Sequence, residues 1–389
     1  MDSERRDPKV VEGLSPVRPI PTDSPEEGPQ EGIALCLSGG GYRAMLFHVG
    51  ALWRLNELAW LSKLARVSSV SGGSITAGVL AHVWSDLGFE NGVAGRFDEV
   101  VVAPVRELAG KTIDVWAILE GIFLPGSIAS YVARSYDRQL FRAATLQSLP
   151  DEPRFVFNST NLQSGVLWRF SKPYMWDYRV GEVPKPNEKL ATAVAASSAF
   201  PPFLSPMKLR LSPSDYVPGT GTDLEQPGYQ RRPVLSDGGV YDNLGLETAW
   251  KRYTTVLVSD GGGHFAAKQR IWTNWVLQSR RVLGTIDGQV RALRKRQAVG
   301  GFAAGLRKGT YWGIWSDEAD YGLSDPIPAS DAVTKRLARI PTRLAKIDAA
   351  HQELLINWGY AICDTAMRKH VVPGTPRPPS LPYPARPLT

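Results

Sequence analysis

The sequence predicts an α/β protein, because three glycine-rich turns each follow a short apolar run. The first turn, residues 38–43 (SGGGYR), follows residues 33–37, and the second, residues 69–74 (SVSGGS), follows residues 64–67. The third, residues 237–239 (DGG), comes much later. An apolar run that ends in glycines and leads into a helical pattern is typical of a strand turning into a helix. With 389 residues and a hydrophobic fraction of 43%, the chain can form such a core as one domain.

The second turn offers Ser71 as a nucleophile. A reactive serine works best on a sharp bend between strand and helix, where the helix N-terminus supplies free N–H groups and a positive dipole end. The usual pattern is Gly-x-Ser-x-Gly, and here Ser69 replaces the first glycine at a position that only has to be small. Taken alone, the turn is better explained as a helix cap, in which Ser71 or Ser74 caps a helix over residues 75–83.

The first turn predicts an anion-binding loop. Gly39, Gly40 and Gly41 place several backbone N–H groups before the next helix with no side chain in the way. Such a loop suits a phosphate or the oxyanion of an acyl intermediate. A nucleotide is disfavoured, because no Lys-Ser or Lys-Thr follows the glycines and no acidic residue ends a second strand at the expected distance. Arg43 either steadies the loop through backbone carbonyls, which we favour, or meets an anionic headgroup.

The third turn supplies a candidate base, Asp237. None of the five histidines stands in a turn of catalytic type, and only His264, after a run of glycines, remains a possible neighbour of the site. A Ser-His-Asp triad is therefore harder to assemble than a Ser-Asp dyad. Asp260 is a rival to Asp237, because it also follows a strand-like run and precedes glycines. For both residues the alternative is an ordinary turn, since Asp-Gly is a common turn pair.

Five blocks in this order resemble the patatin-like phospholipase family. That family carries a Gly-Gly-Gly-x-Arg/Lys loop, a Gly-x-Ser-x-Gly turn and a later Asp-Gly-Gly or Asp-Gly-Ala turn, which residues 39–43, 69–73 and 237–239 match. Residues 158–165 (NSTNLQSG) and 195–203 (AASSAFPPF) resemble two further blocks. The resemblance extends from about residue 32 to about residue 265 and departs from the family pattern only at Ser38 and Ser69.

The resemblance implies a three-layer α/β/α patatin-like domain with a central, mostly parallel sheet. We expect a disordered acidic and Pro-rich tail over 1–31, the catalytic domain over 32–325, C-terminal helices packed on the core over 326–372, and a Pro-rich, disordered tail over 373–389. The resemblance also favours Asp237 over Asp260 as the base, because the family's Asp-Gly-Gly precedes an Asn, as Asp237 here precedes Asn243.

The implied activity is that of a serine lipid acyl hydrolase of phospholipase A or lysophospholipase type. Ser71 would attack the ester, Asp237 would accept its proton, and the loop of Gly39, Gly40 and Gly41 with Gly72 would hold the oxyanion. We expect no metal or cofactor: there are two cysteines and no His-x-x-x-His or Cys-x-x-Cys pair. The alternatives are a neutral-lipid or small-ester hydrolase and a non-catalytic relative that binds lipid or a partner.

Positive charge is concentrated in residues 266–310, which hold ten Lys or Arg and one acid, Asp287. A helix is predicted over 286–298, with Ile286, Val290 and Leu293 sharing one face. The rest of that helix carries its cations, which are Arg291, Arg294, Lys295 and Arg296. The segment is interpreted either as a helix that packs on the body by its apolar stripe and leaves its charged face in solvent, or as a peripheral membrane surface for anionic lipid. No zinc-finger spacing or aromatic RNA-binding signature supports nucleic acid.

The remaining expectations concern location and one apolar segment. No apolar run reaches the roughly 18 residues of a membrane span, and the charged residues 2–6 lack the apolar core of a secretory signal. We therefore expect a cytoplasmic, peripherally membrane-associated protein, and the sequence leaves its oligomeric state open. Residues 113–124 are predicted to form either a lid or acyl-chain wall over the site or a plain core helix.

Overall fold

The fold is built on one large β-sheet. The structure, a computed structural model, describes residues 29–113, 128–264, 267, 269–271 and 274–389. Its strands are β1 (Gln30–Leu37), β2 (Leu64–Ser69), β3 (Phe89–Glu90), β4 (Val93–Ala94), β5 (Arg154–Asn161), β6 (Val166–Phe170), β7 (Tyr174–Asp177), β8 (Gly181–Pro184), β9 (Met207–Lys208), β10 (Val234–Asp237), β11 (Tyr253–Asp260) and β12 (Lys308–Gly313).

Five neighbouring strands of this sheet are parallel. The order is β12-β11-β1-β2-β5-β6-β7-β8, and β9 and β10 attach through β5. The strands from β12 to β5 pair in parallel, whereas β6 to β10 pair antiparallel. β3 and β4 form a separate hairpin. The sheet is therefore mostly parallel in the half that contains the first two glycine-rich turns.

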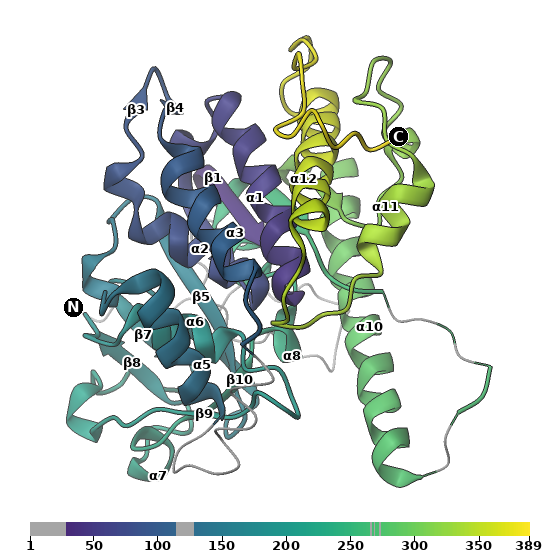
Figure 1. The fold of residues 1–389 in the computed structure, drawn as a ribbon. Coiled ribbons are helices and arrows are strands. Elements are labelled where there is room, and N and C mark those ends of the chain that lie inside the picture. The colour runs from purple at the N-terminus through teal and green to yellow at the C-terminus, as the bar shows by residue number, and fades with distance from the viewer. Residues whose placement is uncertain (1–28, 114–127, 265–266, 268, 272–273) are drawn as a thin grey trace.

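Helices cover both faces of the sheet (Figure 1). They are α1 (Gly41–Glu57), α2 (Gly72–His82), α3 (Ala103–Ala109), α5 (Ile128–Tyr136), α6 (Leu190–Ser197), α7 (Pro227–Gln230), α8 (Gly239–Asp242), α9 (Glu247–Trp250), α10 (Trp275–Ala303), α11 (Asp331–Ala338) and α12 (Ala349–His370).

The side chains of β1 alternate between the two faces of the sheet, and this explains the layers. Leu35 and Leu37 belong to the larger core, under α1, α2 and α12, while Ala34 and Cys36 face the smaller core, under α9 and α10. Successive strand residues point to opposite faces, so both sides of this central strand are buried. This arrangement confirms the predicted three-layer α/β/α fold with a C-terminal helical region.

The C-terminal helix α12 is an integral part of the helical layer beside α1. A Cβ on Gly50 of α1 would lie 1.9 Å from the carbonyl oxygen of Ile356, and a Cβ on Gly359 of α12 would lie 1.9 Å from that of Phe47. The two helices can approach this closely only because glycine occupies both crossing positions. The crossing is also tied by a buried ion pair between Arg54 and Asp364, 2.8 Å apart.

The expectation of a disordered tail over 373–389 differs from the structure. Leu388 is completely buried, and its carbonyl oxygen accepts a hydrogen bond from the Ser330 amide at 2.7 Å. Asn357 of α12 donates to the carbonyls of Tyr383 and Arg386. Proline has no backbone N–H, so backbone hydrogen bonds to this segment are few. Side chains of α12 and a few apolar contacts also hold it, and composition alone does not reveal these partners. The N-terminal tail through residue 28 and residues 114–124 of the predicted lid lie outside the described residues.

The helix expected over 286–298 lies within α10, but its faces are reversed from the expectation. The basic side chains Arg291, Arg294 and Lys295 contact the body, whereas Ile286 and Leu293 are exposed. Two buried or half-buried acids of the body, Asp260 and Glu247, attract the cations inward, because an isolated buried carboxylate is costly. Within the described residues, no helix is both long enough and apolar enough to cross a bilayer.

Candidate active site

Strand β5 brings Ser71 and Asp237 together. β2 runs along one edge of β5 in parallel and ends with Ser69 opposite Phe157. β10 runs along the same edge from the other end, antiparallel, and ends with Asp237 opposite Ser159. The carboxyl ends of the two strands therefore meet head to head, two residues apart along β5, which is about 7 Å.

The backbone of Ser71 has the conformation of a nucleophile turn. Its φ is 51° and its ψ is −119°, values that non-glycine residues rarely adopt and that cost of order 1–3 kcal/mol. The surroundings hold it there: the Ser71 amide donates to Ser197 Oγ at 3.1 Å, and Ser197 Oγ donates to the Asn158 carbonyl at 2.6 Å. Ser71 is 7% exposed and stands at the N-cap of α2, where its side chain makes no capping hydrogen bond.

Asp237 is a buried carboxyl group, and no cation among the described residues pairs with it. Burial raises its pKa to about 7, although the Gly239 amide, which donates to Oδ1 at 2.7 Å, and the nearby Ser71 hydroxyl act in the opposite direction. Its other oxygen, Oδ2, has no hydrogen-bond partner of normal geometry. A carboxyl with this pKa and an unused oxygen is suited to accept a proton near neutral pH.

The glycine loop lies directly against Ser71. A Cβ on Gly39 would lie 3.1 Å from the Cβ of Ser71, and one on Gly72 would lie 2.2 Å from the Gly41 carbonyl oxygen. Gly39 donates its amide to the Asn243 carbonyl at 3.0 Å, so it is not available to a substrate. Among the described residues, the amides of Gly40, Gly41 and Gly72 have no acceptor. The oxyanion donors expected at Gly40, Gly41 and Gly72 are thus unused, while Gly39 contributes the close approach.

Arg43 holds the loop from behind. It is buried, its Nε and Nη2 each lie 3.2 Å from the carbonyl oxygen of Gly261, and its Nη2 also donates to Thr342 Oγ1 at 3.0 Å. A further hydrogen bond joins its Nη1 to the Ile340 carbonyl. Arg43 therefore links the loop to the end of β11 and to the segment that precedes α12.

Asp260 is engaged in structural contacts. Burial alone would raise its pKa, but the Arg291 guanidinium, 3.3 Å away, holds the pKa below its ordinary value, with the Gly262 amide and the Tyr311 hydroxyl as further donors. His264 is exposed, and its ring lies 5.3 Å from that of Trp315. Neither residue has a recorded contact with Ser71.

Two residues that support both turns were quoted in the sequence blocks but given no role there. Ser197, at the end of α6, accepts from the Ser71 amide through its hydroxyl, and its carbonyl accepts from the Gly238 amide at 3.2 Å. Asn158 donates to the Ser69 carbonyl at 2.9 Å. The order of the blocks was the signal for these residues, but only the fold shows which atoms they hold.

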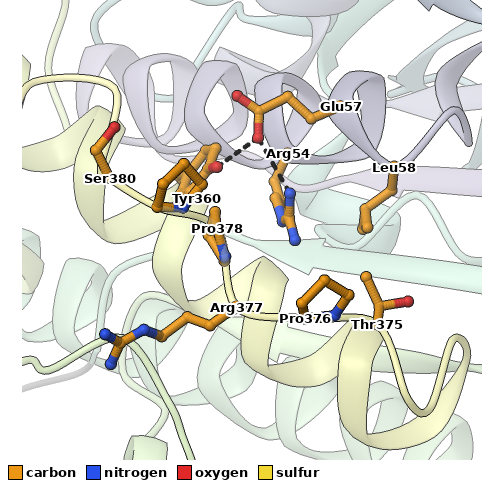
Figure 2. Close-up of a pocket in the computed structure, with 10 residues that line it drawn as sticks. Arg54, Glu57, Leu58, Tyr360, Thr375, Pro376, Arg377, Pro378 and Ser380 are labelled. Atoms are coloured by element: carbon orange, nitrogen blue, oxygen red, sulfur yellow. Dashed lines mark hydrogen bonds and ion pairs between the residues drawn. The ribbon is translucent and has the colours of Figure 1, made fainter.

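Two cavities lie away from these turns. One, of about 430 Å³, lies between the end of α1, α12 and the Pro-rich C-terminal segment, and it is lined by Arg54, Glu57 and Tyr360 (Figure 2). Another, of about 300 Å³, lies between α5, the start of α6 and β9. Neither includes Ser71 or Asp237, so neither cavity marks the site. Among the described residues no cluster of three His, Cys, Asp or Glu side chains could hold a metal ion.

Residues 35–250 match the family model described as patatin-like phospholipase. This is more than half of the chain, so the chain belongs to the patatin-like phospholipase family, a family of lipid acyl hydrolases. A search of curated proteins finds no match to the sequence.

Solved structures give distant matches. Human GIVD cytosolic phospholipase A2 matches with a TM-score of 0.49 and 15% identity over 86% of this chain and 58% of that chain. VipD from Legionella pneumophila matches with a TM-score of 0.36 and 15% identity over 87% of this chain and 67% of that chain. The chain thus spans less than two thirds of the human protein that it matches.

Proposed function

We propose that the protein is a serine lipid acyl hydrolase that cleaves carboxylic esters through a Ser71–Asp237 dyad and an acyl-enzyme. One observation carries the proposal. Ser71, on a strained turn, faces a buried carboxyl that has one unused oxygen and a pKa of about 7. An ordinary helix cap requires neither the strain nor a buried acid without a cation.

The dyad performs four proton transfers, two in each half of the reaction. Asp237 accepts the hydroxyl proton as Ser71 Oγ attacks the ester carbonyl, and the tetrahedral intermediate collapses to an acyl-serine while the proton passes to the departing alcohol. Water then attacks the acyl-serine, Asp237 accepts its proton, and the fatty acid leaves as Ser71 regains a proton. The sequence of steps requires Asp237 to be ionised at its start.

The unused amides of Gly40, Gly41 and Gly72 are the proposed oxyanion donors. They lie at the helix N-termini of α1 and α2, whose dipoles add positive potential there. Each such donor lowers the barrier by about 2.7–4 kcal/mol. Arg43 is proposed to support this loop, because its hydrogen bonds fix the backbone next to the donors.

The proposed substrates are phospholipids or lysophospholipids at a membrane surface, which the segment 266–310 would meet. Family membership supports a lipid ester, and the exposed apolar side chains of α10 in that segment support a lipid surface. A neutral lipid or small ester remains the alternative substrate. A non-catalytic relative is the alternative of another class.

The test is fatty-acid release from phospholipid vesicles by the wild type, Ser71→Ala and Asp237→Asn. We expect release to be lost in both variants, while Ser85→Ala, a change of the same type at an exposed serine, retains it. Release that survives Asp237→Asn alone would contradict the dyad and direct attention to Asp260 or His264. If the folded wild type releases no fatty acid and does not react with a fluorophosphonate at Ser71, the enzyme assignment itself is wrong.

A further inference from the structure

Four exposed apolar side chains lie along one face of the long helix α10. Trp275, Val282, Ile286 and Leu293 are 75%, 51%, 55% and 59% exposed. Their separations of seven, four and seven residues place them on one face of a helix, and we call these four residues the outer stripe. Leu277, Leu283 and Val299 are exposed on the other faces of α10, and Ala298 and Phe302 pack on the smaller core. Figure 1 shows the first part of α10 extending beyond the rest of the fold.

The opposite face of α10 contacts the body. Over residues 291–295 the contacts are made by charged side chains, and Ala298 and Phe302 add apolar contacts further along the helix. Arg291 pairs with Asp260 at 3.3 Å, Arg294 pairs with Glu247 at 2.8 Å, and the Lys295 ammonium lies 4.7 Å from the centre of the Tyr311 ring. A surface helix ordinarily buries its apolar face, because hydration of apolar area is unfavourable by about 25 cal/mol per Å². Around Leu293 the helix instead pairs its charged side chains with the body and leaves the apolar ones exposed, which favours an apolar partner for the outer stripe.

The helix α10 passes beside the candidate active site. α10 packs against α8, the turn of helix that follows Asp237. The Asp287 carboxylate on α10 is close enough to contribute to the raised pKa of Asp237. Val240 of α8 and Phe200 are each 48% exposed. Phe200 lies near the site because the carbonyl of its neighbour, Ala199, accepts a hydrogen bond from the Asp237 amide. Exposed apolar groups therefore continue from the helix to the turns around Ser71.

We propose that the outer stripe of α10, together with Val240 and Phe200, docks the protein on a phospholipid bilayer by apolar insertion. This deepens the proposed function and rests on it, since continuity with a lipid hydrolase site is what favours a bilayer over a protein partner. A tryptophan at one end suits the headgroup level. Arg296, exposed one turn from Leu293, suits the phosphate that all phospholipids carry.

The mode of docking distinguishes this surface from an electrostatic one. Three of the basic side chains of α10 are committed to contacts with the body, so anionic lipid adds little. Binding is then expected on zwitterionic phosphatidylcholine vesicles, with little change when salt rises from about 0.05 M to about 0.5 M. A polybasic surface would instead require anionic lipid and would be released by salt.

The experiment measures co-sedimentation of the full chain with phosphatidylcholine vesicles for wild type, Ile286→Glu and Leu277→Glu. Ile286 and Leu277 are 55% and 46% exposed on the same helix, but helical spacing places Leu277 on the other face. We expect Ile286→Glu to lower the partition coefficient at least about tenfold, and Leu277→Glu to change it little. Hydrolysis of a soluble short-chain ester should be the same in all three, because neither side chain belongs to the site.

A second readout locates the stripe in the lipid. Lipids with brominated chains should quench wild-type fluorescence, and Trp275→Phe should remove most of that quenching while the protein remains bound. Equal loss of binding in both glutamate variants, or binding only to anionic vesicles, would overturn apolar docking through this face. A dimer that Ile286→Glu dissociates, with no vesicle binding, would assign the stripe to a second copy and also overturn it. Failure of the short-chain ester assay would instead count against the proposed function, because vesicle binding is measured independently.

Discussion

Two aspartates of this protein occupy the same local setting and have opposite electrostatic states. Asp237 and Asp260 each end a strand and each is buried, and two glycines follow Asp237 while three follow Asp260. The pKa of Asp237 is raised to about 7 by burial, whereas Arg291 and two further donors hold the pKa of Asp260 below its ordinary value. A turn sequence therefore sets where a carboxyl stands, and its partners set what it can do.

The partners come from different distances along the chain. Asp260 receives its cation from α10, 31 residues further on, and its hydroxyl donor from Tyr311 on β12. The groups that lower the pKa of Asp237 are local, the Gly239 amide and the nearby Ser71 hydroxyl, and among the described residues no cation acts on it. An acid kept buried without a cation is unfavourable for stability, and such groups are concentrated at functional sites.

The largest expected effect separates the two residues by activity. Asp237→Asn should reduce the rate of ester hydrolysis by about 10³- to 10⁴-fold, because an amide cannot accept the serine proton. Asp260→Asn should retain hydrolysis within about tenfold per folded molecule, since its contacts hold α10 and β12 rather than Ser71. The measurement is kcat on a soluble ester, with active enzyme counted by fluorophosphonate labelling. Comparable losses in both variants would erase the distinction.

The second effect concerns stability, and here the substitution of Asp260 should matter most. Asp260→Asn should lower the free energy of unfolding by about 2–4 kcal/mol, because it leaves the Arg291 guanidinium half-buried without its anion. Urea unfolding at pH 7 measures this difference. Asp223→Asn, which removes the partner of Arg179 in an exposed ion pair, is the control and should matter much less. If Asp260→Asn leaves the free energy of unfolding unchanged, the ion pair of Asp260 does not stabilise the fold.

A third effect follows from the raised pKa of Asp237. Ionising this carboxyl costs more in the folded state than in the unfolded chain, so wild type loses stability as pH rises from about 4 through about 7. Asp237→Asn removes that loss. The variant should be more stable than wild type by on the order of 1–3 kcal/mol at pH 8 and nearly equal to it at pH 4.

Thermal or urea unfolding at the two pH values checks this prediction. Asp260→Asn supplies the opposite sign: its depressed pKa stabilises the wild type above pH 4, so that variant should lose stability at pH 8. An inactive Asp237→Asn that is also less stable at pH 8 would contradict the interpretation of Asp237 as a strained, unpaired acid.

The sequence predicted the elements of the site better than their connections. The three-layer fold and the family followed from five blocks in order, because each block is a local turn with its own steric requirements. The sequence could not predict that β2 and β10 meet on one edge of β5. The antiparallel register of β10 on β5 depends on contacts between residues about 75 positions apart, such as Ser159 and Asp237. The roles of Ser197 and Asn158 depend on the same register.

The largest error, the orientation of α10, has a related origin. Helical spacing correctly placed Ile286 and Leu293 on one face, but spacing cannot say which face meets the body. That choice was decided by Asp260 and Glu247, two acids that lie before the helix in the chain and bind its cations. The Pro-rich C-terminus was likewise ordered by distant partners on α12.

The smallest expected effect concerns the link between α10 and Asp237. Hydrolysis of a soluble ester should rise with pH through a midpoint near 7, as Asp237 ionises. The Asp287 carboxylate opposes that ionisation, so Asp287→Asn should move the midpoint to lower pH by less than about one unit, and Asp287→Glu should restore it. Full pH profiles of kcat/KM for the three proteins measure the shift. Because Asp260 titrates below its ordinary range, a midpoint that moves upward in Asp287→Asn, or one near pH 4 in wild type, would mean that Asp237 is not the group being observed.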